Sequence, residues 1–371
     1  MLRSQALVEF NQDLKVLERP LPVPKGPEVL IKTTFGGLCH SDVHLYEGHF
    51  NLGRDMKLPV PIKLPIALGH EIEGTVVAVG EDVPKDAFVD GKSYAIFPWI
   101  GCGKSSCSNC VSDCEHWCTS PDKKKFADGE SGDSLYGGYS SHNLIPHWKY
   151  LLDYEGAVPK GLGCAYMCSG LTAYSALLKV KDLGINAEDV LILGLGGLGF
   201  QAVGMAKAVL GGMPLVADID ENKLKEAEKR GCRAYNTTDK KAVAKIMKES
   251  NDGTGIKAVI DFVGAGKTVT FGDAILRKGG KLVVVGLFGG TFAQPTIFFP
   301  LKARCIEGSF VGSLEETKDM LQLLRNNRDS VEFPPHHFVS IFEASKSLKE
   351  LQAGQIFGRR IFKHDWPTSR N

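Results

Sequence analysis

The pattern of hydrophobic and polar positions changes near residue 187. Before this point, short apolar runs such as EVLIKTTF and GTVVAVG are separated by Gly, Pro and Asp, which is typical of strands joined by turns. After it, compact apolar runs alternate with stretches of helical periodicity. Alternating strands and helices predict a doubly wound parallel sheet. The sequence therefore predicts an α/β protein whose N-terminal part is rich in β-structure.

The second half can be divided into individual elements. We expect strands at DVLILG, PLVAD, KAVIDFV and KLVVVG, and helices at GLGFQAVGMAKAVL and ENKLKEAEKRG. Two amphipathic helices follow within ETKDMLQLLRNNR and EASKSLKELQAG, and GRRIFK is predicted as a last strand. In the first half, prolines interrupt residues 51–65, NLGRDMKLPVPIKLP, which are therefore predicted to form a loop.

Length and charge narrow the classes of function. A chain of 371 residues is long enough for two domains with cores of their own. Its 44 Lys and Arg balance 43 Asp and Glu, so nothing favours a nucleic acid or an anionic membrane as partner. No apolar run reaches the roughly 18 residues of a membrane span, and the first residues do not resemble a secretion signal. We therefore expect a cytoplasmic protein.

The cysteines are unevenly distributed. Five of the ten lie between residues 102 and 118, and four of these have the spacing C-x4-C-x2-C-x7-C, namely Cys102, Cys107, Cys110 and Cys118. Clustered cysteines in an intracellular enzyme are typical of a metal site, and four thiolates close the tetrahedral shell of a structural zinc. The fifth, Cys114, is predicted to be a free thiol, although it is also able to replace a neighbour as ligand.

A glycine-rich segment predicts a dinucleotide site. In DVLILGLGGLGFQAVGMAK the glycines fall between a predicted strand and a predicted helix: Gly194, Gly196, Gly197 and Gly199. Such glycines permit a tight turn, a close approach of the pyrophosphate and close packing of helix on strand. The free N–H groups at the helix N-terminus then bind the phosphates.

An acidic residue 19 positions beyond Gly199 indicates the cofactor. Asp218 ends the strand PLVAD, where a carboxylate accepts hydrogen bonds from ribose hydroxyls and repels a 2′-phosphate. The position favours NAD over NADP. Two other interpretations remain open, namely that Asp218 only caps the following helix or that Asp220 is the relevant acid.

A second set of potential metal ligands is dispersed: Cys39 in GGLCHSDVH, His70 in LGHEIEG and Cys168 in MCSGLTAY. Taken singly, these residues predict little, because buried cysteines usually act as small hydrophobic residues and most histidines bind no metal.

The motifs together carry a family resemblance over essentially the whole chain. G-x-C-H-S-D-x-H, G-H-E-x-x-G, the cysteine cluster, C-S-G-x-T-x-Y and G-x-G-G-x-G occur in the order found in zinc-containing alcohol dehydrogenases of the medium-chain dehydrogenase/reductase superfamily. The sequence resembles that family. The resemblance implies a GroES-like catalytic domain, here residues 1–162 and 310–371, interrupted by a Rossmann domain at residues 163–309.

The resemblance also implies a set of site residues. Cys39, His70 and Cys168 match the ligands of a catalytic zinc. The catalytic residues implied are Ser41, which contacts the substrate oxygen, His44, the outer member of a proton relay, and Glu71, which binds zinc in some members. The cofactor contacts implied, besides the glycines and Asp218, are Lys223, Thr172, Gly286, Leu287 and Arg359. Phe50 and Trp99 match positions that line the substrate pocket, and together with Leu287 and Phe288 they favour hydrophobic or aromatic alcohols.

One departure from the family concerns the cysteine cluster. The family has two residues between its first and second cysteines, whereas this chain has four, CGKSSC. Strict counting places Lys104 at the first position, and Lys is a poor zinc ligand. We predict that the loop bulges and that Cys102 still binds.

The resemblance implies the reaction. Zinc acts as Lewis acid on the alcohol, NAD accepts the hydride, and Ser41 passes the proton through the ribose hydroxyl to His44. We therefore expect an NAD-linked alcohol dehydrogenase with two Zn²⁺ per chain that acts on a small alcohol or carbonyl compound, as a homodimer or homotetramer. The alternatives are an NADP-linked, cinnamyl-type aldehyde reductase and a non-catalytic relative that keeps the fold for binding or structural use.

Overall fold

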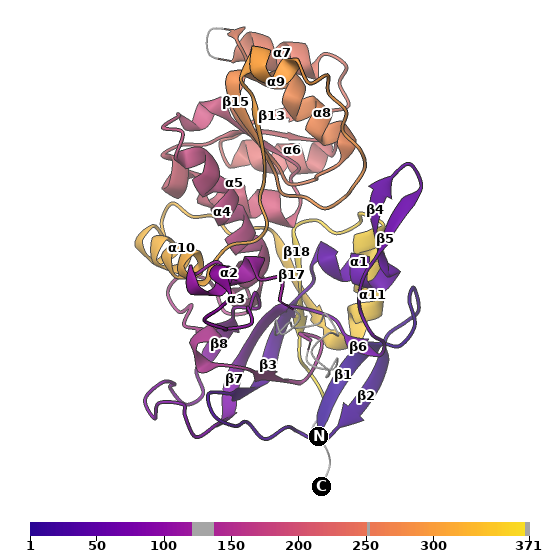
Figure 1. The fold of residues 1–371 in the computed structure, drawn as a ribbon, viewed down its shortest axis with the longest axis vertical. Coiled ribbons are helices and arrows are strands. Elements are labelled where there is room, and N and C mark those ends of the chain that lie inside the picture. The colour runs from indigo at the N-terminus through magenta and orange to yellow at the C-terminus, as the bar shows by residue number, and fades with distance from the viewer. Residues whose placement is uncertain (121–136, 251–252, 368–371) are drawn as a thin grey trace.

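The computed structural model describes residues 1–120, 137–250 and 253–367. Two sheets of different character dominate it, and they lie in the lower and upper parts of Figure 1. The upper sheet is parallel, and its strands lie in the order β13 (Arg233–Asn236), β12 (Leu215–Asp218), β11 (Val190–Leu193), β14 (Ile256–Asp261), β15 (Leu276–Val284) and β16 (Cys305–Gly308).

The chain enters this sheet at β11, in its middle, continues outward through β12 and β13, and then adds β14, β15 and β16 on the other side of β11. This is the doubly wound arrangement predicted from the sequence. The α/β class and the Rossmann-type sheet are thereby confirmed. The accompanying helices are α5 (Gly197–Leu210), α6 (Glu221–Lys229), α7 (Ala242–Glu249), α8 (Gly266–Ile275) and α9 (Phe298–Lys302). The strand β11 is buried along its whole length because helices cover both faces of a parallel sheet.

The lower sheet is mainly antiparallel. Its strands lie in the order β10 (Leu151–Leu152), β8 (Ser93–Ile96), β7 (Glu71–Val79), β3 (Val29–Gly37), β18 (Arg359–Lys363) and β17 (His336–Ser340), and β9 (His142–Ile145) also pairs with β3. A small sheet of β2 (Lys15–Arg19), β1 (Leu2–Leu7) and β6 (Ile66–Ala67) lies beside it. The C-terminal strand β18 thus pairs directly with the N-terminal β3.

Helices join and brace the two sheets. The remaining helices are α1 (His40–Glu47), α2 (Ser108–Val111), α3 (Gly163–Ala165), α4 (Leu171–Lys181), α10 (Leu314–Asn326) and α11 (Ala344–Gln352). A π-helical turn, η3 (Tyr166–Gly170), continues α3 into α4. Short 3₁₀ turns are η1 (Glu115–Trp117), η2 (Trp148–Tyr150), η4 (Ala187–Asp189) and η6 (Ile341–Glu343). One hydrophobic cluster runs from Ile31 and Ile72 of the lower sheet through Leu171 to Val190 and Phe200 of the upper unit.

The structure corrects the prediction for residues 51–65. Their first part forms a β-hairpin from β4 (His49–Gly53) and β5 (Met56–Pro59). Gly53, Arg54 and Asp55 take positive φ values of 79°, 52° and 63°, which close the tight turn between the strands. Proline has no N–H group to donate to a neighbouring strand. Pro59 is the last residue of β5, however, and so does not disrupt the hairpin.

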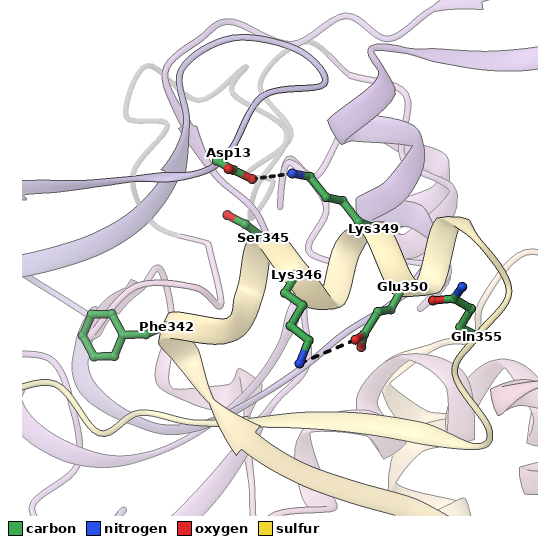
Figure 2. A pocket seen from close by; sticks show the side chains of 7 residues that line it. All are labelled: Asp13, Phe342, Ser345, Lys346, Lys349, Glu350 and Gln355. Carbon is green, nitrogen blue, oxygen red and sulfur yellow. Dashed lines mark hydrogen bonds and ion pairs between the residues drawn. The ribbon is translucent and has the colours of Figure 1, made fainter.

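Helix α11 is fastened to the N-terminal segment. Figure 2 shows a surface hollow of about 480 Å³ over this helix, lined mostly by polar and charged side chains. Lys349 donates to Asp13 at 2.8 Å across the hollow, and the Ser345 hydroxyl accepts from the Leu14 N–H at 2.9 Å. None of the predicted site residues lines this hollow. Within the described parts of the chain, no helix is long and apolar enough to cross a membrane.

A buried carboxylate ties the lower sheet to the segment that leads into α3. Glu73 of β7 accepts a hydrogen bond from the Tyr154 hydroxyl at 2.5 Å and from the Gly161 N–H at 3.1 Å. Burial raises the pKa of Glu73 despite these donors. Because water is excluded, the donors replace the solvation that the carboxylate loses.

We predict that Tyr154→Phe lowers the free energy of unfolding by about 1–3 kcal/mol, because it removes a donor from a buried carboxylate. Urea unfolding followed by circular dichroism measures this change. Tyr166→Phe is the matched control, since the buried Tyr166 hydroxyl has no hydrogen-bond partner among the described residues. Equal losses in the two variants would contradict the role given to Glu73.

Candidate active site

Three dispersed ligands meet at one buried point. Cys39 directly precedes α1, His70 directly precedes β7, and Cys168 lies in the π-helical turn η3. Together with Glu71, their ligand atoms all lie within 4.8 Å of one another. The Cys39 and Cys168 sulfurs are 3.9 Å apart, and His70 Nε2 lies 3.1 Å from the Cys168 sulfur. The fold thus brings Cys39 and His70 together with Cys168, which follows them by 129 and 98 positions.

This set has the chemistry and spacing of a zinc site. With zinc–sulfur bonds of about 2.3 Å and tetrahedral angles, two sulfur ligands lie about 3.8 Å apart. The separation of Cys39 and Cys168 agrees with that value. Two sulfurs and one imidazole also leave a fourth position for a substrate oxygen, as catalytic zinc sites do. The residues therefore fit the metal, while Glu71 supplies a further oxygen within reach.

Asp42 holds two of these ligands and was not singled out from the sequence. Its carboxylate accepts from the N–H groups of Cys39 and Gly69, each at 3.0 Å, and lies 3.9 Å from His70 Nδ1. At the third position of α1 it also caps the helix that Cys39 begins. Burial raises its pKa to about 6. A carboxylate beside the second nitrogen of a ligating imidazole is a common support in metal sites, but this proximity arises only in the folded chain.

Glu71 and Arg359 form a buried ion pair behind the ligand set. The Arg359 guanidinium donates to the Glu71 carboxylate, and both side chains are at most 5% exposed. Burial raises the pKa of Glu71 to about 7, although the arginine acts in the opposite direction. Arg359 also lies against the glycine-rich turn, since a Cβ on Gly197 would be 2.8 Å from its Cδ. The pair therefore connects the ligand set with the nucleotide-binding turn.

Helix α1 carries the two residues of the predicted proton relay. The Ser41 hydroxyl lies 3.7 Å from the Cys39 sulfur, and His44 lies one turn further along the helix. The His44 ring is buried, 4.9 Å from the Phe50 ring of β4. Burial lowers the pKa of His44 below its ordinary value. A neutral imidazole at this position is ready to accept a proton.

Aromatic side chains flank the ligand set. The Trp99 ring lies 5.2 Å from the His70 ring, and its indole N–H donates to the Met167 carbonyl at 3.0 Å. Phe310, 49% exposed, packs edge-on against Trp99 at 5.8 Å. The sequence pattern did not single out Phe310, because it lies in a segment without periodicity between a strand and a helix. Trp99 and Phe310 thus provide apolar surface beside the ligands.

The glycine-rich turn has the geometry of a dinucleotide site. Gly194 has φ 92°, and a Cβ there would lie 2.5 Å from Val263 Cγ2. A Cβ on Gly199 would lie 2.0 Å from the Gly194 carbonyl oxygen, so helix α5 packs closely on its strand. Gly196 is exposed with open space around it, and α5 begins at Gly197. The buried Arg359 Nε, which has no hydrogen-bond partner among the described residues, supplies a free donor beside this turn for an anionic group.

Asp218 and Asp220 have different tasks. Asp218 ends β12, and its carboxylate accepts from the N–H groups of Leu195 at 2.5 Å, Ile219 at 2.7 Å and Asp220 at 2.9 Å. It therefore reaches the glycine-rich turn. The helix cap is Asp220, whose side chain accepts from the Asn222 N–H at 2.8 Å. The interpretation of Asp218 as a mere cap of α6 is thus wrong.

The remaining predicted cofactor residues lie on three elements. Thr172 is buried in the first turn of α4, and its hydroxyl donates to the Cys168 carbonyl at 2.7 Å. Gly286 and Leu287 follow β15 in a loop, and the Gly286 N–H donates to the Asp261 carbonyl at 3.1 Å. Lys223 lies half-buried in the first turn of α6. Their contacts with a nucleotide remain predictions.

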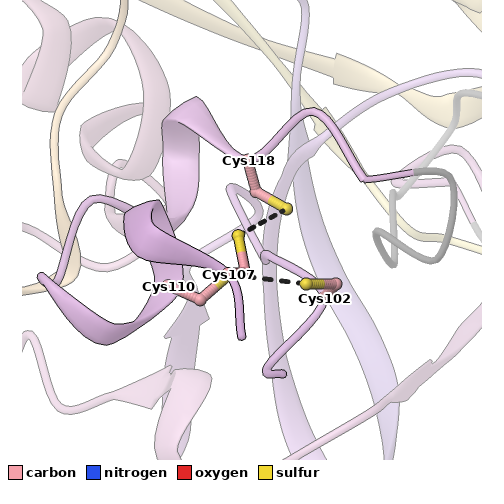
Figure 3. A group of neighbouring side chains, drawn as sticks. All are labelled: Cys102, Cys107, Cys110 and Cys118. Carbon is pink, nitrogen blue, oxygen red and sulfur yellow. Dashed lines mark hydrogen bonds between the residues drawn. The ribbon is translucent and has the colours of Figure 1, made fainter. Parts of the chain in front are cut away.

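The four-cysteine loop forms a second set of ligands, shown in Figure 3. The sulfurs of Cys102 and Cys110 are 3.8 Å apart and those of Cys107 and Cys118 are 3.9 Å apart, and all four lie within 4.8 Å of one another. These separations match the value of about 3.8 Å for a tetrahedral zinc–thiolate site. Cys114 precedes the turn η1 and is not part of this set. The longer loop after Cys102 therefore still brings its sulfur to the other three.

A glycine-rich turn at the switch point of a parallel sheet, together with a buried set of cysteine and histidine ligands, is typical of a dinucleotide-linked oxidoreductase.

Comparisons with known proteins agree with this class. The model of the GroES-like domain of alcohol dehydrogenases matches residues 25–154, and the model of zinc-binding dehydrogenases matches residues 197–326. An NAD-dependent alcohol dehydrogenase of Sulfurisphaera tokodaii is 33% identical over 362 residues, covering 97% of this chain and 99% of that protein.

Two further relatives extend the comparison. Cinnamyl alcohol dehydrogenase 2 of Rauvolfia serpentina is 32% identical over 319 residues, covering 84% of this chain and 82% of the relative. The structure of acetophenone reductase from Geotrichum candidum in complex with NAD superimposes with a TM-score of 0.79 at 26% identity, covering 98% and 97% of the two chains. The chain therefore belongs to the zinc-type alcohol dehydrogenases of the medium-chain dehydrogenase/reductase superfamily.

We predict that Cys102→Ser lowers the zinc content by one ion per chain, because three thiolates no longer close the shell. Inductively coupled plasma mass spectrometry of the purified variant measures the change. Cys114→Ser is the matched control and should retain the full zinc content. Loss of metal from Cys114→Ser together with full retention in Cys102→Ser would assign the fourth ligand to Cys114 instead.

Proposed function

We propose that the protein is a zinc-dependent, NAD-linked alcohol dehydrogenase that interconverts a primary or secondary alcohol with its aldehyde or ketone. The observation that carries the proposal is the convergence of Cys39, His70 and Cys168 at one buried point, with the Ser41 hydroxyl beside it. A purely structural zinc site does not require a hydroxyl such as that of Ser41 or a buried histidine such as His44 on the adjoining helix α1. The four cysteines of the second loop would hold a further, structural zinc.

The reaction needs a proton and a hydride to leave one carbon–oxygen group. When bound, zinc supplies Lewis acidity toward the substrate oxygen and the nicotinamide supplies the hydride acceptor. The Ser41 hydroxyl would take the proton of the substrate hydroxyl as it releases its own toward the neutral His44 imidazole on the same helix, from which the proton leaves to solvent. Asp42 keeps the Cys39 backbone and His70 in place during the transfer. In the reverse direction the same groups return the proton.

The choice of NAD follows from Asp218. Its carboxylate accepts from the N–H group of Leu195 in the glycine-rich turn and from those of Ile219 and Asp220 directly after β12, so its oxygens lie beside the turn. A 2′-phosphate would be repelled there, whereas ribose hydroxyls would be accepted as donors. An NADP-linked, cinnamyl-type reductase is the second candidate because of the Rauvolfia relative, but the Asp218 carboxylate disfavours it.

Two further properties belong to the proposal. Trp99 and Phe50 line the substrate pocket, so that hydrophobic or aromatic alcohols are preferred to ethanol.

The protein is also proposed to form a homodimer or homotetramer. Three exposed residues near the outer strand β16 offer apolar surface for this contact, namely Ile297, Phe298 and Leu301.

The central test combines metal analysis with kinetics. We expect two zinc ions per chain, oxidation of alcohols with NAD at a much higher kcat/KM than with NADP, and a higher kcat/KM for cinnamyl or benzyl alcohol than for ethanol. Removal of zinc by a chelator should abolish turnover, and added Zn²⁺ should restore it. The highest kcat/KM with ethanol would overturn the substrate preference, and activity that survives complete metal removal would overturn the mechanism.

A separate prediction concerns His44. Alcohol oxidation needs its neutral form, and because burial lowers its pKa, the neutral form persists below pH 6.5. We expect kcat for oxidation to fall only as the pH drops below that value. His44→Gln should lower kcat at pH 7 by up to about 10²-fold and remove this part of the pH profile. An acidic limb that is identical in the wild type and the variant would show that His44 does not carry the proton.

A further inference from the structure

The β4–β5 hairpin touches the Rossmann-type unit through backbone atoms. Figure 1 shows the hairpin rising from the lower part of the molecule toward the upper unit. A Cβ on Gly289 would lie 1.9 Å from the Asn51 carbonyl oxygen, and a Cβ on Gly53 would lie 2.9 Å from the Gly290 Cα. Real Cβ atoms essentially never approach another atom closer than 3.0 Å. The contact therefore leaves no room for even one methyl group.

The loop that the hairpin contacts, residues 286–289, is held by hydrogen bonds to residues 263–264. The N–H groups of Phe288 and Gly289 donate to the carbonyls of Val263 and Gly264, both at 3.1 Å. A Cβ on Gly286 would lie 2.1 Å from the Val263 carbonyl carbon. The segment 286–289 thus follows the adjoining segment 263–264 at backbone distance. Its hydrogen bonds tie the loop to segment 263–264, directly after β14, and the hairpin rests against the loop that is held in this way.

The contact joins two parts of the proposed active site. The loop begins with Gly286 and Leu287, which are predicted to contact the cofactor. The hairpin carries Phe50, whose ring packs 4.9 Å from the ring of His44. Apolar side chains are exposed on both partners, with Leu52 42% exposed on the hairpin and Leu287 48% exposed on the loop. A displacement of the hairpin would therefore move a pocket wall relative to the cofactor.

We propose that Gly289 is a specificity-determining position, because the absence of its Cβ lets the hairpin close directly against the cofactor-side loop and so sets the width of the substrate mouth. The inference rests on the proposed function, since the mouth is that of the alcohol site. A methyl group at 289 must move the hairpin outward by about 1 Å, from the 1.9 Å contact to at least 3.0 Å. A small alcohol then loses contact with the wall, whereas a bulky alcohol still reaches it.

The test compares Gly289→Ala with Gly290→Ala. Both positions have positive φ, 91° and 117°, so both variants carry backbone strain. Only the Cβ on 289 points at the hairpin, because the nearest atom to a Cβ on 290 is the Gly266 nitrogen at 3.1 Å. We expect Gly289→Ala to lower the ratio of kcat/KM for 1-propanol over cinnamyl alcohol by about tenfold, mainly through KM for 1-propanol. Gly290→Ala should keep the wild-type ratio.

A second readout is independent of turnover. In hydrogen–deuterium exchange, we expect the amides of residues 49–59 to exchange faster in Gly289→Ala than in the wild type and in Gly290→Ala. Gly53→Ala approaches the same contact from the hairpin side and should shift both readouts in the same direction. It is the deciding variant if Gly289→Ala does not fold.

The outcomes separate the two proposals. If the wild type oxidises no alcohol with NAD, the proposed function fails, while the exchange experiment still tests the contact. If the wild type is active and neither the selectivity ratio nor the exchange of residues 49–59 changes in Gly289→Ala and Gly53→Ala, the inference about Gly289 is overturned alone. A ratio that changes equally in Gly290→Ala would trace the effect to backbone strain and would also overturn it.

Discussion

Burying Cys39, His70 and Cys168 at one point is unfavourable unless their polar atoms and their backbone have partners, because water cannot compensate there. The surrounding structure supplies these partners. Asp42 accepts from the backbone on both sides of the set, at Cys39 and Gly69. Arg359 neutralises Glu71 from the C-terminal strand. Segments from the beginning, the middle and the end of the chain thus have to be in place together before the site exists.

The two units share one hydrophobic cluster, which is consistent with the need to assemble the ligand set from distant segments of the chain. Cys168 lies in a π-helical turn between α3, which packs on the lower sheet, and α4, which packs on α5 of the upper unit. A π-helical turn disrupts the regular helical hydrogen bonding and is frequently found at functional sites. Gln201 of α5 donates to the Ser169 hydroxyl at 2.8 Å, directly beside the ligand. Helix α5 and the candidate ligand Cys168 are thereby positioned by neighbouring residues.

Much of this architecture was readable from the sequence, for identifiable reasons. The parallel strands are continuous apolar runs, and the glycine-rich turn has a spacing that few other structures require, so both could be located. The hairpin of β4 and β5 could not, because prolines in this segment suggested a loop and its turn depends on a positive φ at Arg54, a residue that is not typical of such a position. Asp42 and Phe310 were missed because their importance comes from contacts that only the folded chain creates. The assignment of Cys102 depended on loop geometry that spacing alone left open.

The position of β18 has a consequence for how the protein is made. This strand, residues 359–363, lies inside the lower sheet between β3 and β17, and it carries Arg359. During synthesis all strands of the upper unit, up to β16, leave the ribosome before β17 and β18 do, so that unit is able to fold while the lower sheet is still incomplete. Cys39 and His70 are made early, but their surroundings are complete only after β18 has been synthesised and has paired with β3. The set of candidate ligands at Cys39, His70 and Cys168 is therefore expected to be assembled late, after β18 has been made.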